Sequence, residues 1–115
     1  MQLPENSELL RVFVGDGDRH AGKPLYEAIV LAARERHLAG ATVLRGSLSY
    51  GAHSRIHTAK ILRLSEDLPM VVEIVDEAAK IEAFLPVLDA MMDGGMVTVE
   101  PVRVLTYRHH EAGKS

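Results

Sequence analysis

Residues Gly40–Gly51, GATVLRGSLSYG, join a short β-type core to a glycine-punctuated break. The core, Thr42-Val43-Leu44, contains β-branched residues that favour strands. No acidic residue occurs from position 45 to 63, where the basic residues and histidines are Arg45, His53, Arg55, His57, Lys60 and Arg63. Because clustered cations raise the local potential whatever the net charge of the chain, we expect an anionic ligand to bind near this stretch.

Composition limits the classes of protein to consider. The chain has 115 residues, of which 47% are hydrophobic, so we expect one globular domain. The absence of cysteine excludes disulfides, thiolate metal sites and a cysteine nucleophile, and is compatible with the cytoplasm, where we expect the protein to act. No signal peptide or membrane span is predicted. A net charge of -3 and the lack of tryptophan argue against a nucleic-acid partner.

The apolar periodicity predicts four strands and two helices. The strands are expected at 9–15, about 41–47, 70–75 and 96–107. One helix should begin at Pro24 and end near His37–Leu38, with Gly40 beyond its C-cap. The other should be capped by Asp76 and stop at Gly94-Gly95. Residues 9–108 would form the domain, with 1–8 and 109–115 as flexible ends.

Residues 48–67 are expected to form a flexible excursion that pairs partly with the preceding strand. A strand, a helical turn and a mobile arm all remain open for His57–Leu64. The predicted element order, βαββαβ, is that of an α+β, ferredoxin-like fold with both helices on one face of an antiparallel sheet. The other face would expose apolar side chains, which is typical of an oligomer.

The chain resembles the DUF190 family, also called UPF0166, which is related to the PII signal-transduction proteins. The resemblance spans nearly the whole domain. It is carried by Gly22–Glu27 (GKPLYE), Gly40–Gly46 (GATVLRG), Gly51, Ile56-His57, Asp67–Asp76 (DLPMVVEIVD) and Gly94–Tyr107 (GGMVTVEPVRVLTY).

Similarity to PII proteins implies a homotrimer that binds adenine nucleotides in clefts between subunits and reports the bound state to a protein partner through a loop. We therefore predict a regulatory protein, not an enzyme, whose ligand is a small anionic metabolite. The chain departs from the PII pattern at Ser49-Tyr50-Gly51, which replaces Gly-Phe-Gly, and at Asp93–Met96, which replaces a lysine-bearing turn. Arg108 alone stands near the PII basic signature.

The predicted effector-binding residues combine glycines, through which a ligand can approach the main chain, with polar and cationic side chains. They are Gly15, Gly22, Lys23, Gly40, Thr42, Arg45, Gly46, Gly51 and Arg108. For Arg45 the alternative is a solvated cation at a sheet edge. For Thr42 it is a simple preference for strand, and for Gly46 and Gly51 a requirement of backbone geometry.

Residues Gly17–Lys23 have the spacing of a P-loop, but Pro24 replaces the magnesium-binding Ser or Thr. A turn followed by a proline-started helix is the simpler interpretation. A weaker hypothesis is that this helix start binds an anion through its N–H groups.

His53 and His57 are four residues apart, which suggests a second hypothesis: a divalent-metal-binding trimer resembling the CutA proteins, which share this general fold. No carboxylate near them in sequence completes a metal site, so we assign no metal ligands. No catalytic set is evident, although a small enzyme or a structural interaction protein remains a third hypothesis.

Overall fold

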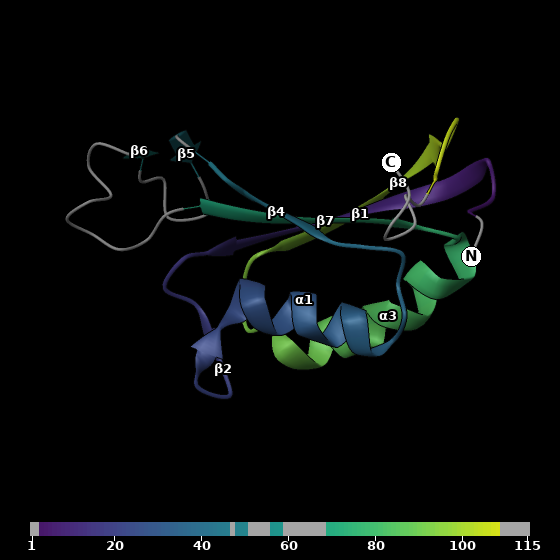
Figure 1. The fold of residues 1–115 in the computed structure, drawn as a ribbon. Coiled ribbons are helices and arrows are strands. Elements are labelled where there is room, and N and C mark those ends of the chain that lie inside the picture. The colour runs from purple at the N-terminus through teal and green to yellow at the C-terminus, as the bar shows by residue number, and fades with distance from the viewer. Residues whose placement is uncertain (1–2, 47, 51–55, 59–68, 109–115) are drawn as a thin grey trace, which may run out of the picture.

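A computed structural model describes residues 3–46, 48–50, 56–58 and 69–108. Its centre is a four-stranded antiparallel sheet in the order β4-β7-β1-β8. The strands are β1 (Asn6–Gly15), β4 (Thr42–Arg45), β7 (Pro69–Asp76) and β8 (Met96–Arg103). The helices α1 (Leu25–Glu35) and α3 (Ala78–Met91) lie side by side on one face of this sheet (Figure 1). The predicted ferredoxin-like arrangement is therefore confirmed.

The core lies between the sheet and the helices. Successive side chains of a strand point to opposite faces, so the even-numbered residues of β1 and β7 meet the helices. The buried cluster comprises Leu10, Val12, Val14, Met70, Val72 and Ile74 from the strands, and Leu25, Ile29, Ala33, Ile81, Phe84 and Leu88 from the helices. Burial of these side chains fixes the register of β1 against β7, because a slip of one residue would turn the apolar set outward.

The face of the sheet opposite the helices is only partly buried. Leu44 on β4 is 48% exposed and Met96 on β8 is 52% exposed. At its centre, Arg11 Nε lies 2.8 Å from Glu73 Oε2 and Arg11 Nη1 lies 2.6 Å from Glu100 Oε1, so one cation links three strands. The hydrogen bond to Glu73 raises the pKa of Arg11 above its ordinary value.

Several boundaries differ from the predicted ones. β1 begins at Asn6 instead of residue 9, because Asn6 and Ser7 pair with the end of β8. The last strand ends at Arg103, not at residue 107.

The helix caps differ as well. α1 ends at Glu35, and the left-handed residue after it is His37 (φ 58°), not Gly40. The N-cap of α3 is Glu77; Asp76 is the last residue of β7 and accepts a hydrogen bond from the Glu77 N–H through its side chain.

Two smaller sheets complete the described structure. The hairpin of β2 (Arg19–His20) and β3 (Lys23–Pro24) precedes α1. β5 (Leu48–Tyr50) pairs with β6 (Ile56–Thr58). The described part of the predicted excursion therefore pairs with itself and not with β4, while its residues 51–55 and 59–67 lie outside the described structure. Within the described residues, no helix has the length and apolarity that a transmembrane segment requires.

Candidate functional site

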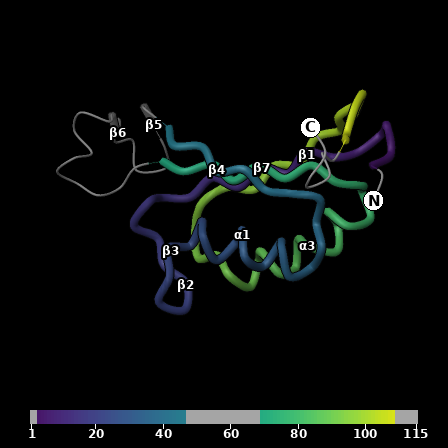
Figure 2. The backbone as a smooth tube through the Cα atoms, viewed as in Figure 1, coloured from purple at the N-terminus to yellow at the C-terminus, as the bar shows by residue number. Residues whose placement is uncertain are grey.

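The predicted effector-binding residues fall mainly at opposite ends of the sheet. We call the first the loop end: there β1 finishes, β4 finishes and β7 begins, at Gly15, Asp16, Arg45, Gly46 and Pro69. We call the second the anchored end: there the α1–β4 connection (Leu38–Ala41) meets Asp76 and Tyr107. Figure 2 shows the β2–β3 hairpin on the helix side of the loop end.

Arg45 is a cation at the loop end. Its Nη1 lies 3.3 Å from Asp16 Oδ2, and its side chain is 48% exposed. The adjacent Gly46 N–H donates to the Pro69 carbonyl at 2.8 Å, and a Cβ at Gly46 would lie 2.8 Å from Pro69 Cγ. A Cβ at Gly46 would therefore not fit without a shift of Pro69, which supports the alternative that Gly46 serves backbone geometry.

Asp18 closes the turn after β1. Its Oδ2 accepts a 2.8 Å hydrogen bond from the Gly15 N–H, and its carbonyl accepts one of 2.7 Å from the Leu25 N–H at the start of α1. These bonds occupy two backbone donors that a bound phosphate would use. The Gly15 amide thus serves the turn in this chain.

The segment with P-loop spacing is a β-hairpin. Ala21 (φ 51°) and Gly22 (φ 80°) form its two-residue turn, and His20 pairs with Lys23. Positive φ at both positions is typical of a type I′ turn, which matches the twist of the flanking strands. Gly22 therefore sets the turn and Lys23 stands exposed beside it, while Pro24 is the N-cap of α1.

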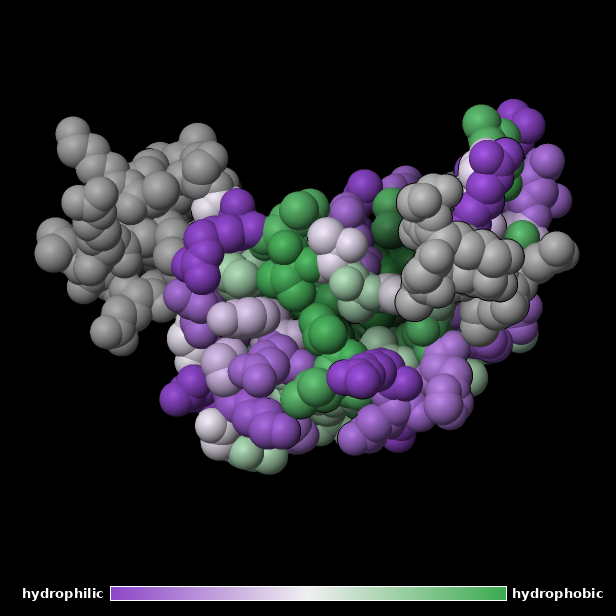
Figure 3. Space-filling model, viewed as in Figure 1, coloured by the Kyte–Doolittle hydropathy of each residue, from purple (hydrophilic) through white to green (hydrophobic). Residues whose placement is uncertain are grey.

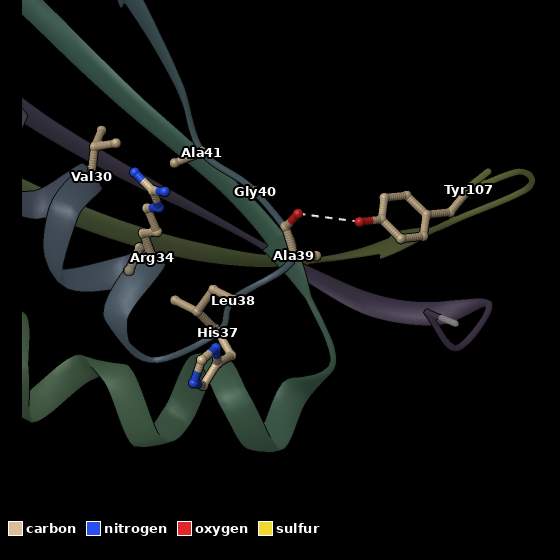
Figure 4. A pocket seen from close by; sticks show the side chains of 9 residues that line it. Val30, Arg34, His37, Leu38, Ala39, Gly40, Ala41 and Tyr107 are labelled. Atoms are coloured by element: carbon tan, nitrogen blue, oxygen red, sulfur yellow. Dashed lines mark hydrogen bonds between the residues drawn. The ribbon is translucent and has the colours of Figure 1, made fainter. Parts of the chain in front are cut away.

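The anchored end is held by a buried carboxylate. Asp76 is 1% exposed; its Oδ2 accepts from the Ala39 N–H and its Oδ1 from the Glu77 N–H, both at 2.7 Å. From the other side, Tyr107 Oη donates to the Ala39 carbonyl at 3.2 Å (Figure 4). The Ala39 residue is thus fixed through both of its backbone polar groups.

A hollow of about 510 Å³ lies beside this anchor, between α1 and the start of β4. On the side of the molecule shown in Figure 3, hydrophobic side chains gather between the sheet and the helices. The hollow is lined by Val30, Ala33, Arg34, His37, Leu38, Ala39, Gly40, Ala41 and Tyr107. Its lining contains the Arg34 guanidinium and the His37 imidazole and no acidic side chain.

The remaining predicted residues are spread over the chain. Gly40 borders the hollow at the anchored end, and Thr42 is the exposed first residue of β4. Arg108 is exposed and follows Tyr107, whereas Gly51 lies outside the described residues. One copy of the chain therefore does not gather the predicted set into one site.

The sequence did not predict Asp16, Arg34 or Tyr107 as site residues. It predicted Asp76 only as a helix cap. Ala39 and Tyr107 are 68 positions apart, so no local pattern could have paired them. The metal hypothesis rests on His53 and His57, of which His53 lies outside the described residues. Among those that are described, no group of three or more His, Asp or Glu side chains could hold a metal ion.

Comparison with known proteins identifies relatives of the whole domain. The model of the family DUF190, described as "Uncharacterized ACR, COG1993", matches residues 7–104. A UPF0166 protein of Aquifex aeolicus is 40% identical over 98 residues, covering 85% of this chain and 92% of the relative. A UPF0166 protein of Methanocaldococcus jannaschii is 28% identical over 99 residues, covering 85% and 91%.

Two solved structures share the fold. Both are of CPII, a nitrogen regulatory PII-like protein from Thiomonas intermedia K12, one bound to ADP, AMP and bicarbonate and the other to ADP and bicarbonate. The TM-scores are 0.60 and 0.54, at 14% and 17% sequence identity, and each comparison covers 86% of this chain and 88% of the other. At this level of identity the comparison establishes a PII-like fold.

Proposed function

Because this chain belongs to the DUF190 family and has a PII-like fold, we propose that it is a regulatory protein that binds a small anionic effector of the adenine nucleotide class. Binding takes place in clefts between the subunits of a homotrimer. The segment between β4 and β7 passes the bound state to a protein partner.

The observation that carries this proposal is the state of Arg45. It is a half-exposed cation at the end of β4, and among the described residues its Nη1 pairs with Asp16 Oδ2 at 3.3 Å. An exposed pair of this kind contributes little to stability, typically 0.2–1 kcal/mol, so a phosphate or bicarbonate can replace Asp16 at low cost. The bound ADP, AMP and bicarbonate of the CPII structures support this class of ligand.

The uncovered sheet face supports self-association. Leu44 and Met96 leave about half of their side-chain surface to solvent, and burying such surface contributes roughly 25 cal/mol per Å². Packing of this face against neighbouring subunits would also place the loop end of one copy near other elements of the next. This would allow a cleft to draw on predicted residues that one chain keeps apart.

Thermal unfolding against AMP, ADP, ATP and bicarbonate tests the effector. A ligand that binds only the folded state stabilises it by about 2.7 kcal/mol at 100-fold excess over Kd. We expect one of these anions to raise the midpoint of the wild type, and Arg45→Gln to abolish most of the shift. Arg103→Gln removes a more exposed, also ion-paired arginine from β8 and should preserve the shift. The proposal fails if none of the three nucleotides shifts the wild type.

Sedimentation equilibrium tests the assembly. Leu44→Asp places a charge on the uncovered sheet face and should convert trimers to monomers. Leu105→Asp changes a leucine that is 77% exposed and lies beyond β8, so it should leave the trimer intact. A wild-type protein that sediments as a monomer would contradict the inter-subunit cleft.

A further inference from the structure

The hollow at the anchored end has features that the proposed effector site does not use. We propose that it is a second binding site, for a small organic anion with an apolar body, anchored by Arg34. This inference goes beyond the proposed function, because it rests on Arg34, which is not among the predicted effector-binding residues, and not on Arg45 or on contact between subunits.

The size and lining of the hollow suit such a ligand. Sites for small molecules are typically 300–1,000 Å³, mostly apolar, with a few polar groups that fix orientation, and this hollow measures about 510 Å³. Val30, Ala33, Leu38 and Ala41 supply the apolar surface. Polar groups come from Arg34 and His37, so an anionic head and an apolar body can be satisfied together.

Among the described residues, Arg34 differs from three other arginines whose side chains already pair with carboxylates. Arg11 pairs with Glu73 and Glu100, Arg45 with Asp16, and Arg103 with Glu5. Within the described part of the chain, no partner is found for the Arg34 guanidinium. The same holds for the side chains of Arg19, Arg36 and Arg108, but of these four only Arg34 lines the hollow. In Figure 4 its guanidinium extends from α1 toward Ala41 at the start of β4, across the space that the hollow occupies.

The helix end beside the hollow does not oppose an anion strongly. Free carbonyls at a helix C-terminus carry partial negative charge. Here three of these carbonyls are capped: Ala32 O accepts from the Arg36 N–H, Ala33 O from Leu38 and Arg34 O from His37. The last two bonds form a Schellman motif, for which His37 adopts the left-handed conformation that glycine usually supplies.

The opposite wall of the hollow is rigid. The hydrogen bonds from Tyr107 and to Asp76 hold Ala39 in place next to Gly40, which also lines the hollow. A preformed wall lowers the ordering cost that binding must overcome. Left-handed non-glycine residues such as His37 are costly and cluster at ligand sites, which agrees with this placement.

Isothermal titration of the full-length chain with two matched probes tests the site. 1-Naphthoate carries a carboxylate on an apolar body, and 1-naphthylmethylammonium carries the opposite charge on the same ring system. We expect the wild type to bind the carboxylate at least tenfold more tightly than the ammonium ion. Equal affinity for the two would reduce the hollow to an apolar patch and overturn the proposal.

Three charge-removing variants locate the anion. Arg34→Gln should weaken 1-naphthoate binding about tenfold, as expected for loss of a charge-assisted hydrogen bond. Arg36→Gln makes the same change two residues further along the chain and serves as the control. The Arg36 side chain lines a different hollow, between α1, α3 and the β2–β3 hairpin, so its replacement should not change 1-naphthoate binding.

Arg45→Gln, at the loop end, should also leave 1-naphthoate binding unchanged. Each substituted side chain is exposed, and equal unfolding midpoints of the free variants would verify folding. Full affinity in Arg34→Gln, or a loss in Arg45→Gln alone, would refute the site.

Discussion

The two ends of the sheet differ in how their charged groups are held. At the anchored end, a buried aspartate uses both oxygens on backbone N–H groups at 2.7 Å. At the loop end, an exposed arginine and a partly exposed aspartate meet at 3.3 Å. A buried, fully bonded group is costly to disturb, whereas a surface ion pair is exchanged easily. The first arrangement suits a structural support, and the second suits a site that exchanges one anion for another.

The largest effect is expected from breaking the anchor. Asp76→Ala leaves the Ala39 and Glu77 N–H groups without their acceptor and opens a small void. Hydrogen bonds to charged groups contribute about 1.5–3 kcal/mol each, so we expect a loss of about 3 kcal/mol in the free energy of unfolding. Urea denaturation would measure it.

Asp76→Asn is the matched control, because the amide keeps the shape and one acceptor oxygen. It should retain part of the stability that Asp76→Ala loses. If Asp76→Ala costs under 1 kcal/mol, the anchored end is not held by this carboxylate and the contrast between the two ends disappears.

A pair of glycines compares backbone packing at the two ends. In Gly46→Ala, the new Cβ would lie 2.8 Å from Pro69 Cγ, so the chain must shift; overpacking of this kind costs about 1–3 kcal/mol. Gly40→Ala meets nothing within 4 Å and should be neutral or slightly stabilising. Thermal denaturation of both variants would check this order. A larger loss for Gly40→Ala would contradict the packing described.

The sequence predicts the layers of this protein better than it predicts the site. The alternation of Leu10, Val12 and Val14 specifies a half-buried strand, and the apolar run of β7 specifies its central place in the sheet. Both patterns are local, so the fold could be derived from them. The resemblance to DUF190 then supplied the family, which the comparisons confirm.

The site depends on pairs that are distant in sequence. Asp16 and Arg45 are 29 positions apart, and Ala39 and Asp76 are 37 apart. Gly40 was expected beyond the C-cap on the general preference for glycine, yet His37 adopts the left-handed conformation because the Schellman bonds form around it. Contacts between residues distant in sequence therefore determine the site, and local propensities do not predict them.

His37 provides the next smaller test. Left-handed backbone costs a non-glycine residue roughly 1–2 kcal/mol, whereas glycine adopts it freely but loses more entropy on folding. His37→Gly should therefore raise the free energy of unfolding by about 0.5–1 kcal/mol in chemical denaturation. Ala21→Gly makes the same exchange in the hairpin at the loop end, at φ 51°, and should give a similar gain. A loss of stability in His37→Gly alone would show that the imidazole makes a stabilising contribution that outweighs the strain.

The smallest effect on stability, and the most informative about function, is expected from the pair at the loop end. Asp16→Asn keeps the shape of the side chain and removes its charge, so it should change the free energy of unfolding by no more than about 0.5 kcal/mol. The same change frees Arg45 and removes a negative charge that an incoming phosphate would meet. Affinity for the anion that stabilises the wild type should therefore rise, and the Arg45→Gln, Asp16→Asn double variant should lose that gain.

Titration calorimetry of the wild type, the two single variants and the double variant forms a double-mutant cycle. We expect the effects of the two substitutions on anion affinity to be coupled. Their effects on the free energy of unfolding should be nearly additive. Strong coupling in stability with none in binding would instead identify the pair as a structural contact, and the two ends of the sheet would then differ in degree only.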